Sequence, residues 1–294
     1  MTLANDSSAR PPKKTGRALR IDFTAPKGDP GLIGPGSVSW RVSANPIALA
    51  VGGIAAVILE LAEPRVRAGV WDHSTFKVDP INRMKNTGLA AMTVTYGPTR
   101  AAEMMFARVT RMHERVGGLT HEGAPYQAMD DDLLTWVHVT AAWGFLNAYI
   151  RYVEPRMTRA DQDRYYKEGE IIAKGFGAKW VPTSVDEVNA YMAAMVLKLY
   201  ANDTIDAFLK LTAETPVYGR LAQGVQRRVV DAAIELVPDD IRRILKLDAK
   251  PAKKVRPLLR TLARLAGFAL RFANGPQQQA CKRMGVSTAA LRPA

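Results

Sequence analysis

Residues 45–61 read NPIALAVGGIAAVILEL and contain the most apolar run of the chain. Asn45 is a suitable helix N-cap, because its side-chain oxygen can accept hydrogen bonds from free backbone N–H groups, and proline at position 46 suits the first helical turn. The run from Ile47 to Leu59 is shorter than the ~20 residues that a membrane-spanning helix needs. We therefore expect a helix that is buried in the core of a soluble protein.

Apolar side chains at three- and four-residue steps dominate the rest of the chain, and the sequence has no alternating strand pattern and no internal repeat. This spacing is typical of amphipathic helices, so we predict an all-α fold with a single multi-helix domain. Segments 71–80 and 119–129 have no clear period and are expected to be loops. The predicted helices cover residues 46–61, 65–70, 98–116, 130–152, 217–236, 239–245 and 256–272, and a further helix starts at Ser184.

The two ends of the chain differ from its middle. Residues 1–30 are polar and rich in Pro, Lys and Arg, and we expect a disordered or loosely attached arm there. Residues 31–248 would form the domain. Residues 249–294 would form a basic amphipathic extension, which either lies on a membrane surface or packs on the domain; packing on the domain is the preferred interpretation.

The chain is basic, with 41 Lys and Arg against 28 Asp and Glu and a net charge of +13. Most of this excess lies in residues 10–20 and 246–271, while the middle is nearly balanced. A basic flank alone is weak evidence for nucleic-acid recognition, so we do not expect a nucleic-acid partner.

Cys281 is the one cysteine, which excludes an intramolecular disulfide and fits a reducing compartment. No apolar run follows the basic residues near the N-terminus, so a secretory signal is not expected. We predict a cytoplasmic protein, with peripheral membrane contact through the basic C-terminal helix left open.

Two of the four histidines, His113 and His138, lie on apolar faces of predicted helices. A lone buried histidine is most often a core residue that bonds to backbone or to a carboxylate. Two of them on neighbouring amphipathic helices, in a chain without a P-loop or a nucleophile elbow, favour a cofactor instead. Haem fits, because it needs a neutral imidazole on a rigid helix and an apolar slot. No Cys-x-x-Cys-His motif occurs, so haem b is implied.

Several motifs then occur in a fixed order between Glu63 and His138. They are Glu63-Pro64-Arg65-Val66-Arg67-Ala68-Gly69-Val70-Trp71-Asp72-His73-Ser74, Asp79-Pro80-x-x-Arg83-x-x-x-Thr87, Met112-His113-x-x-Val116-x-Gly118, Gly123-x-x-Tyr126-x-Ala128 and Asp132-Leu133-Leu134-x-Trp136-Val137-His138. This order resembles the family of rubber oxygenases and MpaB-type oxygenases over about residues 34–246.

The resemblance implies an all-helical domain that encloses haem b and uses dioxygen on a small apolar, isoprenoid-like substrate. His113 matches the family's axial ligand of the haem iron. Arg83 and Thr87 match the ends of a distal Arg-x-x-Lys-Thr segment, and Asn86 stands where that segment has lysine. Because asparagine carries no charge, the distal pocket of this chain must differ electrostatically.

Three more residues are candidates for the site. Arg242 resembles a late arginine of the family that would pair with a haem propionate, and Arg243 is an equally suitable choice. His138 does not match the ligand and is a candidate pocket residue. His73 is a further histidine to examine beside the cofactor. For Arg83, the alternative is an arginine that only anchors the preceding loop.

Three functions remain open from the sequence. The first is a haem-dependent oxygenase, in which Arg83, Asn86, Thr87 and His138 would be the catalytic residues. The second is a non-enzymatic haem or lipid carrier with the same fold. The third is a surface-bound partner protein that works through its basic tail.

Overall fold

The computed structural model describes residues 20–73, 75–215, 223–248, 255–269 and 272–293. This part of the chain is mostly helical, and its strands are the short antiparallel pair β1 (Gly117–Leu119) and β2 (Pro125–Gln127). The predicted all-α class is therefore confirmed.

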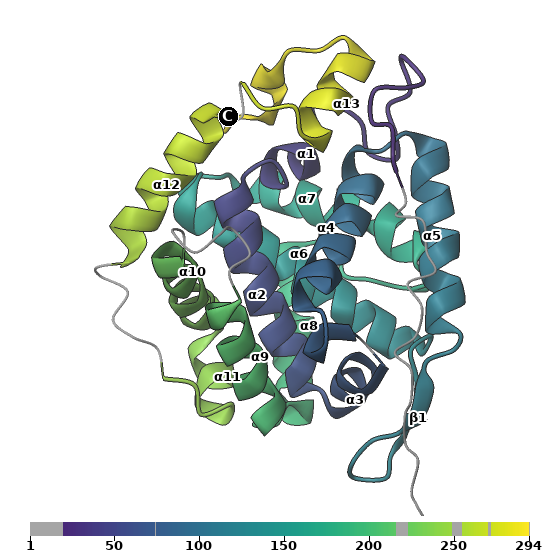
Figure 1. Ribbon diagram of the computed structural model, residues 1–294, viewed down its shortest axis with the longest axis vertical. Helices are drawn as coiled ribbons and strands as arrows, with labels where there is room; N and C mark the ends of the chain where they lie inside the picture. Colours follow the sequence, from purple (N-terminus) through teal and green to yellow (C-terminus); the bar gives the residue numbers. More distant parts are fainter. Residues whose placement is uncertain (1–19, 74, 216–222, 249–254, 270–271, 294) are drawn as a thin grey trace, which may run out of the picture.

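Two long helices, α2 (Pro46–Ala62) and α6 (Asp131–Tyr152), cross at the centre of the molecule (Figure 1). The side-chain oxygen of Asn45 caps α2 by accepting hydrogen bonds from the backbone N–H groups of Ile47 and Ala48, as the sequence predicts. Among the described elements, no other pair of helices packs over so large a contact. This central pair is the framework on which the other helices are placed.

The two central helices touch through their backbones at Gly52 and Gly144. A Cβ atom on Gly52 would lie 2.5 Å from the carbonyl oxygen of Gly144, and a Cβ atom on Gly144 would clash with the carbonyl oxygen of Gly52 in the same way. Because real Cβ atoms do not approach backbone this closely, the crossing requires glycine on both helices.

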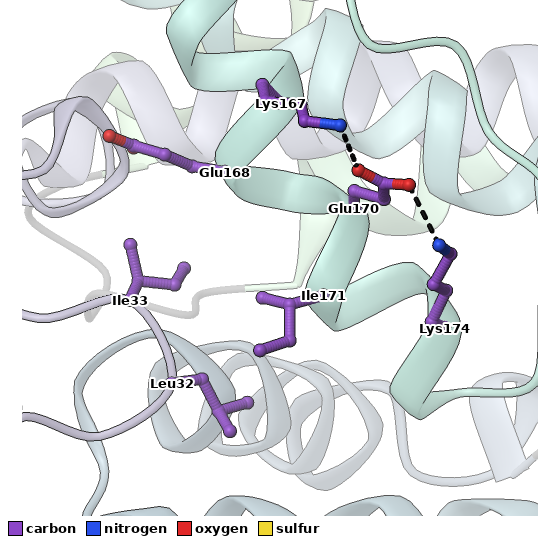
Figure 2. A pocket seen from close by; sticks show the side chains of 7 residues that line it. All are labelled: Leu32, Ile33, Lys167, Glu168, Glu170, Ile171 and Lys174. Atoms are coloured by element: carbon purple, nitrogen blue, oxygen red, sulfur yellow. Dashed lines mark hydrogen bonds and ion pairs between the residues drawn. The ribbon is translucent and has the colours of Figure 1, made fainter.

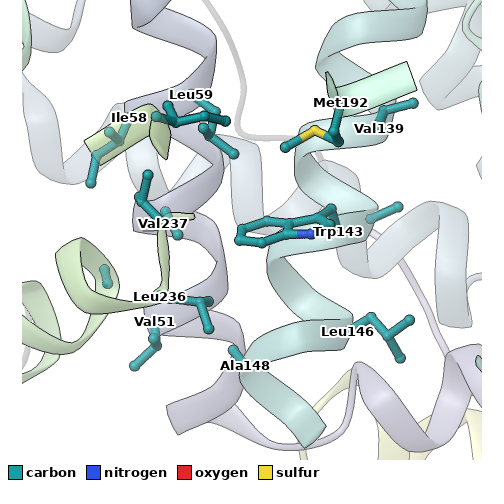
Figure 3. Packing of buried hydrophobic residues seen from close by; sticks show 14 of the residues in the cluster. Val51, Ile58, Leu59, Val139, Trp143, Leu146, Ala148, Met192, Leu236 and Val237 are labelled. Carbon is teal, nitrogen blue, oxygen red and sulfur yellow. The ribbon is translucent and has the colours of Figure 1, made fainter. Parts of the chain in front are cut away.

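Apolar side chains from the surrounding helices pack against this central pair. Figure 3 shows the Trp143 ring of α6 reaching toward Leu236 and Val237, and all three belong to the main hydrophobic cluster. The surrounding elements are α1 (Val38–Val42), α3 (Pro64–His73), α7 (Arg159–Gly175), α8 (Val185–Met195), α9 (Asp203–Glu214), α10 (Gln223–Leu236), α11 (Asp239–Ile244), α12 (Val255–Ala269) and the 3-10 turns η1 (Thr75–Lys77) and η2 (Val196–Lys198).

Helices α4 (Pro80–Tyr96) and α5 (Thr99–His113) pack on each other as a hairpin beside the central pair (Figure 1). α4 also packs on η1, α1 and α13 (Pro276–Met284). Within the described residues, neither α4 nor α5 brings its backbone close to α2 or α6 at more than an isolated point. The hairpin therefore makes few close backbone contacts with the central pair.

The buried side chain of Arg283, on α13, ties the two ends of the described chain to α4. Its guanidinium donates hydrogen bonds to the backbone carbonyl oxygens of Phe23 (2.9 Å), Asp29 (2.7 Å) and Tyr96 (2.8 Å). Phe23 is itself buried in a cluster that includes Trp40 and Tyr96. Three backbone carbonyls that would otherwise lack a donor are satisfied by this one arginine.

These contacts change the predicted domain limits. Residues 1–19 of the expected arm lie outside the described residues, but the chain from about residue 21 onward is packed into the fold rather than loosely attached. In the C-terminal extension, residues 249–254 lie outside the described part, while α12 packs on α2, α10 and α6. The final 3-10 turn, η4 (Thr288–Leu291), packs with α13 and α1.

Several local predictions also differ from the structure. The segment 71–80 is not one extended loop, because α3 continues to His73 and η1 follows it. The helix predicted over 98–116 ends at His113, since residues 117–119 pair with β2 instead. The predicted start of a helix at Val217 lies outside the described residues. Helices α4, α7, α9 and α13 were not predicted.

In the described part of the chain, no single helix is long and apolar enough to span a membrane. The consecutive helices α2 and α3 reach them only when taken together, and they are bent by 109° relative to each other.

The glycine contact gives a test of the framework. Gly52→Ala should lower the free energy of unfolding by about 2 kcal/mol or more, because the new methyl group can be accommodated only if the two backbones separate. Gly53→Ala is the matched control, since its Cβ would meet a ring carbon of Phe145 at an ordinary 3.5 Å. Urea unfolding followed by circular dichroism measures both, and equal effects of the two substitutions would contradict the assignment.

Candidate functional site

Polar side chains from α2, α4, α5 and α6 converge between the hairpin and the central pair. The Arg83 guanidinium on α4 is close enough to lower the pKa of both Glu60 on α2 and His113 on α5. The hydroxyl of Thr140 on α6 lies 3.4 Å from a carboxyl oxygen of Glu60. These four residues, far apart in the sequence, therefore share one region of the molecule.

Glu60 is the acidic group of this region. Burial raises the pKa of its carboxyl to about 7, against the opposing effects of Arg83 and Thr140. Near neutral pH the carboxyl is therefore divided between its protonated and ionised forms. The protonated form donates a hydrogen bond and the ionised form only accepts, so Glu60 can do either.

His113 lies on α5, as predicted, and is the last residue of that helix. Burial lowers the pKa of its imidazole, and Arg83 lowers it further, so the ring is neutral at neutral pH. Its Nδ1 atom is buried without a hydrogen-bond partner among the described residues. A buried nitrogen left unpaired costs roughly 1–3 kcal/mol, and such a cost is expected where a ligand completes the site.

His138 projects from α6 toward α7. Burial lowers the pKa of its imidazole to about 4. A Cβ atom on Gly169 would lie 3.3 Å from Nε2 of His138, so glycine on α7 leaves room for the ring. A neutral imidazole donates a hydrogen bond from one ring nitrogen and accepts one at the other.

Glu60 and His138 are deeply desolvated, and yet both keep part of their surface accessible. Other residues on the same face of α2 as Glu60, and on the same face of α6 as His138, are also partly exposed. We call these partly exposed faces the inner recess; they comprise Gly53, Val57 and Glu60 of α2 and His138, Ala141 and Phe145 of α6. Side chains of the surrounding helices therefore do not fully cover these positions.

Arg83 and Thr87 act as a pair on α4. The guanidinium donates a hydrogen bond to the Thr87 hydroxyl, as the four-residue spacing predicts. The hydroxyl in turn donates to the backbone carbonyl oxygen of Arg83 at 2.9 Å. Asn86 and Thr87 are both exposed, whereas Arg83 is half-buried. The pair thus presents a cation and a hydroxyl from one turn of α4.

Two other candidates lie elsewhere. His73 is exposed at the end of α3, and its Nε2 is 3.0 Å from the hydroxyl of Tyr126. Arg242 forms a 2.9 Å ion pair with Asp239. Its helix, α11, lies on the other side of α2 from α5 (Figure 1). The structure does not bring either residue together with His113, so their assignment as cofactor contacts stays a prediction. Arg243 lies on the same short helix as Arg242.

A surface groove beside α7 offers no comparable chemistry. Figure 2 shows it between Leu32 and Ile33 on one side and α7 on the other. Its two lysines, Lys167 and Lys174, are both paired with Glu170, at 2.6 and 2.9 Å. The described residues also contain no group of three or more His, Cys, Asp or Glu side chains placed to hold a bare metal ion.

Sequence reasoning missed Glu60 and Thr140. A signal for Glu60 was present, because it is the one charged residue within the apolar stretch 45–61. A lone carboxylate on an apolar helix is either paired or functional. Thr140 gives no such signal, since a threonine inside a helix is commonly structural.

Comparison of the sequence with known protein families gives one match. Residues 40–268 match the family described as the ER-bound oxygenase mpaB/B′ and rubber oxygenase catalytic domain. The chain belongs to this family. The match contains Glu60, Arg83, His113 and His138, and it confirms the membership that the motifs predicted. No curated protein and no solved structure matches the chain.

Glu60 and His138 should make the free energy of unfolding depend on pH in opposite directions. The folded pKa of Glu60 is about 7 against an ordinary 4.5, so its contribution is lost as the pH rises from 4.5 to 7. The folded pKa of His138 is about 4 against an ordinary 6.5, so its contribution is lost as the pH falls from 6.5 to 4. In the wild-type protein these two dependences partly cancel.

Single substitutions should therefore reveal each dependence. Relative to wild type, Glu60→Gln should make the free energy of unfolding rise with pH between 4.5 and 7, and His138→Asn should make it fall between 4 and 6.5, each by about 3 kcal/mol. Urea unfolding of protein prepared without added cofactor measures both, with the exposed Glu103→Gln as control. Parallel pH profiles for all four proteins would show that neither group is buried as described.

Proposed function

We propose that the protein is a haem b-dependent oxygenase that uses dioxygen on a small apolar, isoprenoid-like substrate. The observation that carries this proposal is the buried, unpartnered Nδ1 of His113 beside Arg83. Family membership supports an oxygenase function. The haem and the class of substrate are our proposal.

The residues present fit a haem. A neutral imidazole at the end of a helix is a suitable iron ligand, and His113 has this protonation state and an unsatisfied nitrogen. The inner recess is lined largely by Gly53, Val57, Ala141 and Phe145, which suit an apolar macrocycle. When bound, haem would supply the iron that activates dioxygen.

The remaining side chains of the site would bind and orient. Arg83 can donate hydrogen bonds to a polar oxygen of a ligand, and a fixed cationic donor stabilises developing negative charge. The Thr87 hydroxyl accepts a hydrogen bond from the Arg83 guanidinium and would orient it. Asn86 can donate a hydrogen bond but adds no charge. Glu60, with its pKa of about 7, can hold a proton on its carboxyl and exchange it near neutral pH.

The apolar lining argues for the class of substrate. On the α2 and α6 faces of the inner recess, Gly53, Val57, Ala141 and Phe145 carry no side-chain polar atom. Burial of apolar surface would supply most of the binding free energy, roughly 25 cal/mol per Å². A non-enzymatic haem or lipid carrier is the alternative, since the fold alone does not specify a reaction.

Haem reconstitution tests the ligand. His113→Ala should abolish the wild-type Soret band or lower haem affinity by at least about ten-fold, because the iron loses its protein ligand. His73→Ala is the matched control, since that imidazole is exposed and bonded to Tyr126. An unchanged spectrum and affinity in the His113 variant would move the ligand role to His138.

Oxygen consumption by the reconstituted protein with short polyisoprenes and terpenes then separates the two functions. We expect consumption that depends on both haem and substrate. Tight haem binding with no consumption on any of these substrates would favour the carrier.

Ligand binding tests the role of the Arg83–Thr87 pair. In haem-loaded protein, Arg83→Ala and Thr87→Ala should each change dioxygen or cyanide affinity by about ten-fold while leaving haem content unchanged, because the hydrogen bond from Arg83 to the ligand is lost or misdirected. Lys85→Ala, an exposed cation on the same helix, controls for charge. If all three variants bind both ligands like wild type, the pair does not face the iron.

A further inference from the structure

Helix α12 buries one face and leaves another apolar face uncovered. Val255, Leu259 and Ala263 are buried against α2, α10 and α6. On a different face, Leu258, Leu265 and Phe268 are 43%, 59% and 55% exposed, and Phe272, just after the helix, is 79% exposed. A helix that only packs on its domain would present polar residues here.

These four exposed side chains form one stripe, which we call the outer stripe. Leu258, Leu265 and Phe268 follow one another at seven- and three-residue steps, which keeps them on one side of α12. The rings of Phe268 and Phe272 contact each other, with centroids 5.8 Å apart. Single exposed apolar residues are normal on soluble proteins, but a continuous stripe marks an interaction surface.

A line of arginines runs beside the outer stripe. Arg256, Arg260 and Arg264 are exposed and four residues apart, so they lie along the helix between its buried face and the outer stripe. The acidic residue beside them, Glu235, is an ion-pair partner of Arg256. The sequence from Ala249 to its last residue contains no Asp or Glu, and its basic residues are Lys250, Lys253, Lys254, Arg256, Arg260, Arg264, Arg271, Lys282, Arg283 and Arg292.

Charge identifies the partner. A second copy of the chain would bring two lines of arginine together, which like-charge repulsion opposes. A nucleic acid would pair with the arginines but would leave the leucines and phenylalanines in water. An anionic bilayer surface satisfies both features, because apolar side chains enter the acyl boundary while arginines stay at the phosphates.

We propose that α12 and Phe272 dock the protein on the surface of anionic phospholipid membranes. The helix lies along the outer edge of the molecule (Figure 1), so a flat surface can reach it. Its buried face keeps the helix attached to the domain, so that docking requires no unfolding. The proposal is independent of haem and of the reaction.

Vesicle sedimentation of the full chain tests the proposal. Wild type should bind vesicles that contain phosphatidylserine and should bind pure phosphatidylcholine vesicles far less, and added salt should weaken the binding. The double variant Phe268→Ser with Phe272→Ser should lower the partition coefficient at least about ten-fold. Arg264→Gln should lower it about five-fold.

Leu197→Ser is the matched control, because Leu197 is 85% exposed on η2, away from α12. It should bind vesicles like wild type, and thermal unfolding should show all variants folded. Equal binding to neutral and anionic vesicles would overturn the proposal, as would anionic binding that survives the double phenylalanine variant. Absence of vesicle binding together with a dimer that the phenylalanine variant dissociates would assign the outer stripe to a second copy instead.

Discussion

The contact between the backbones of Gly52 and Gly144 sets the geometry on which the rest of the fold depends. With no side chain between them, α2 and α6 approach as closely as two helices can, and their crossing point and angle become fixed. Glu60 stands two turns beyond the crossing on α2, and Thr140 stands one turn before it on α6. The meeting of these two polar groups follows from the glycines.

The α4–α5 hairpin is held in a different way, by contacts near its ends. At the junction of the two helices, the indole N–H of Trp40 donates to the carbonyl oxygen of Thr95 at 2.9 Å, and the Tyr96 hydroxyl donates to the carbonyl oxygen of Trp40 at 2.6 Å. At the other end, η1 packs on the start of α4. The position of the hairpin is therefore fixed by contacts at its two ends rather than by packing of its middle on the central pair.

Residue patterns predicted the central helices because their signals are local. The Asn45 cap and the apolar run after it determine α2 without reference to the rest of the chain. The helix α4 was not predicted, since its first half is polar and only residues 93–96 are buried; its stability comes from tertiary contacts. The motifs predicted that Arg83 and His113 share one site, and the structure places them close together. Glu60 could be recognised as part of the site only from the structure, which places Arg83 beside it. The position of Arg242 depends on where α11 lies in the fold, which no local pattern encodes.

The hydrogen bonds of Arg283 show which residues of this protein must fold together. The family match ends at residue 268, yet this arginine, further along the chain, satisfies carbonyl groups at residues 23, 29 and 96. A chain shortened to the matched range would lose α13, and Trp40 and Tyr96 would lose their cover. The range that matches the family is therefore smaller than the segment that packs as one unit, and residues beyond it complete the packing around the end of α4.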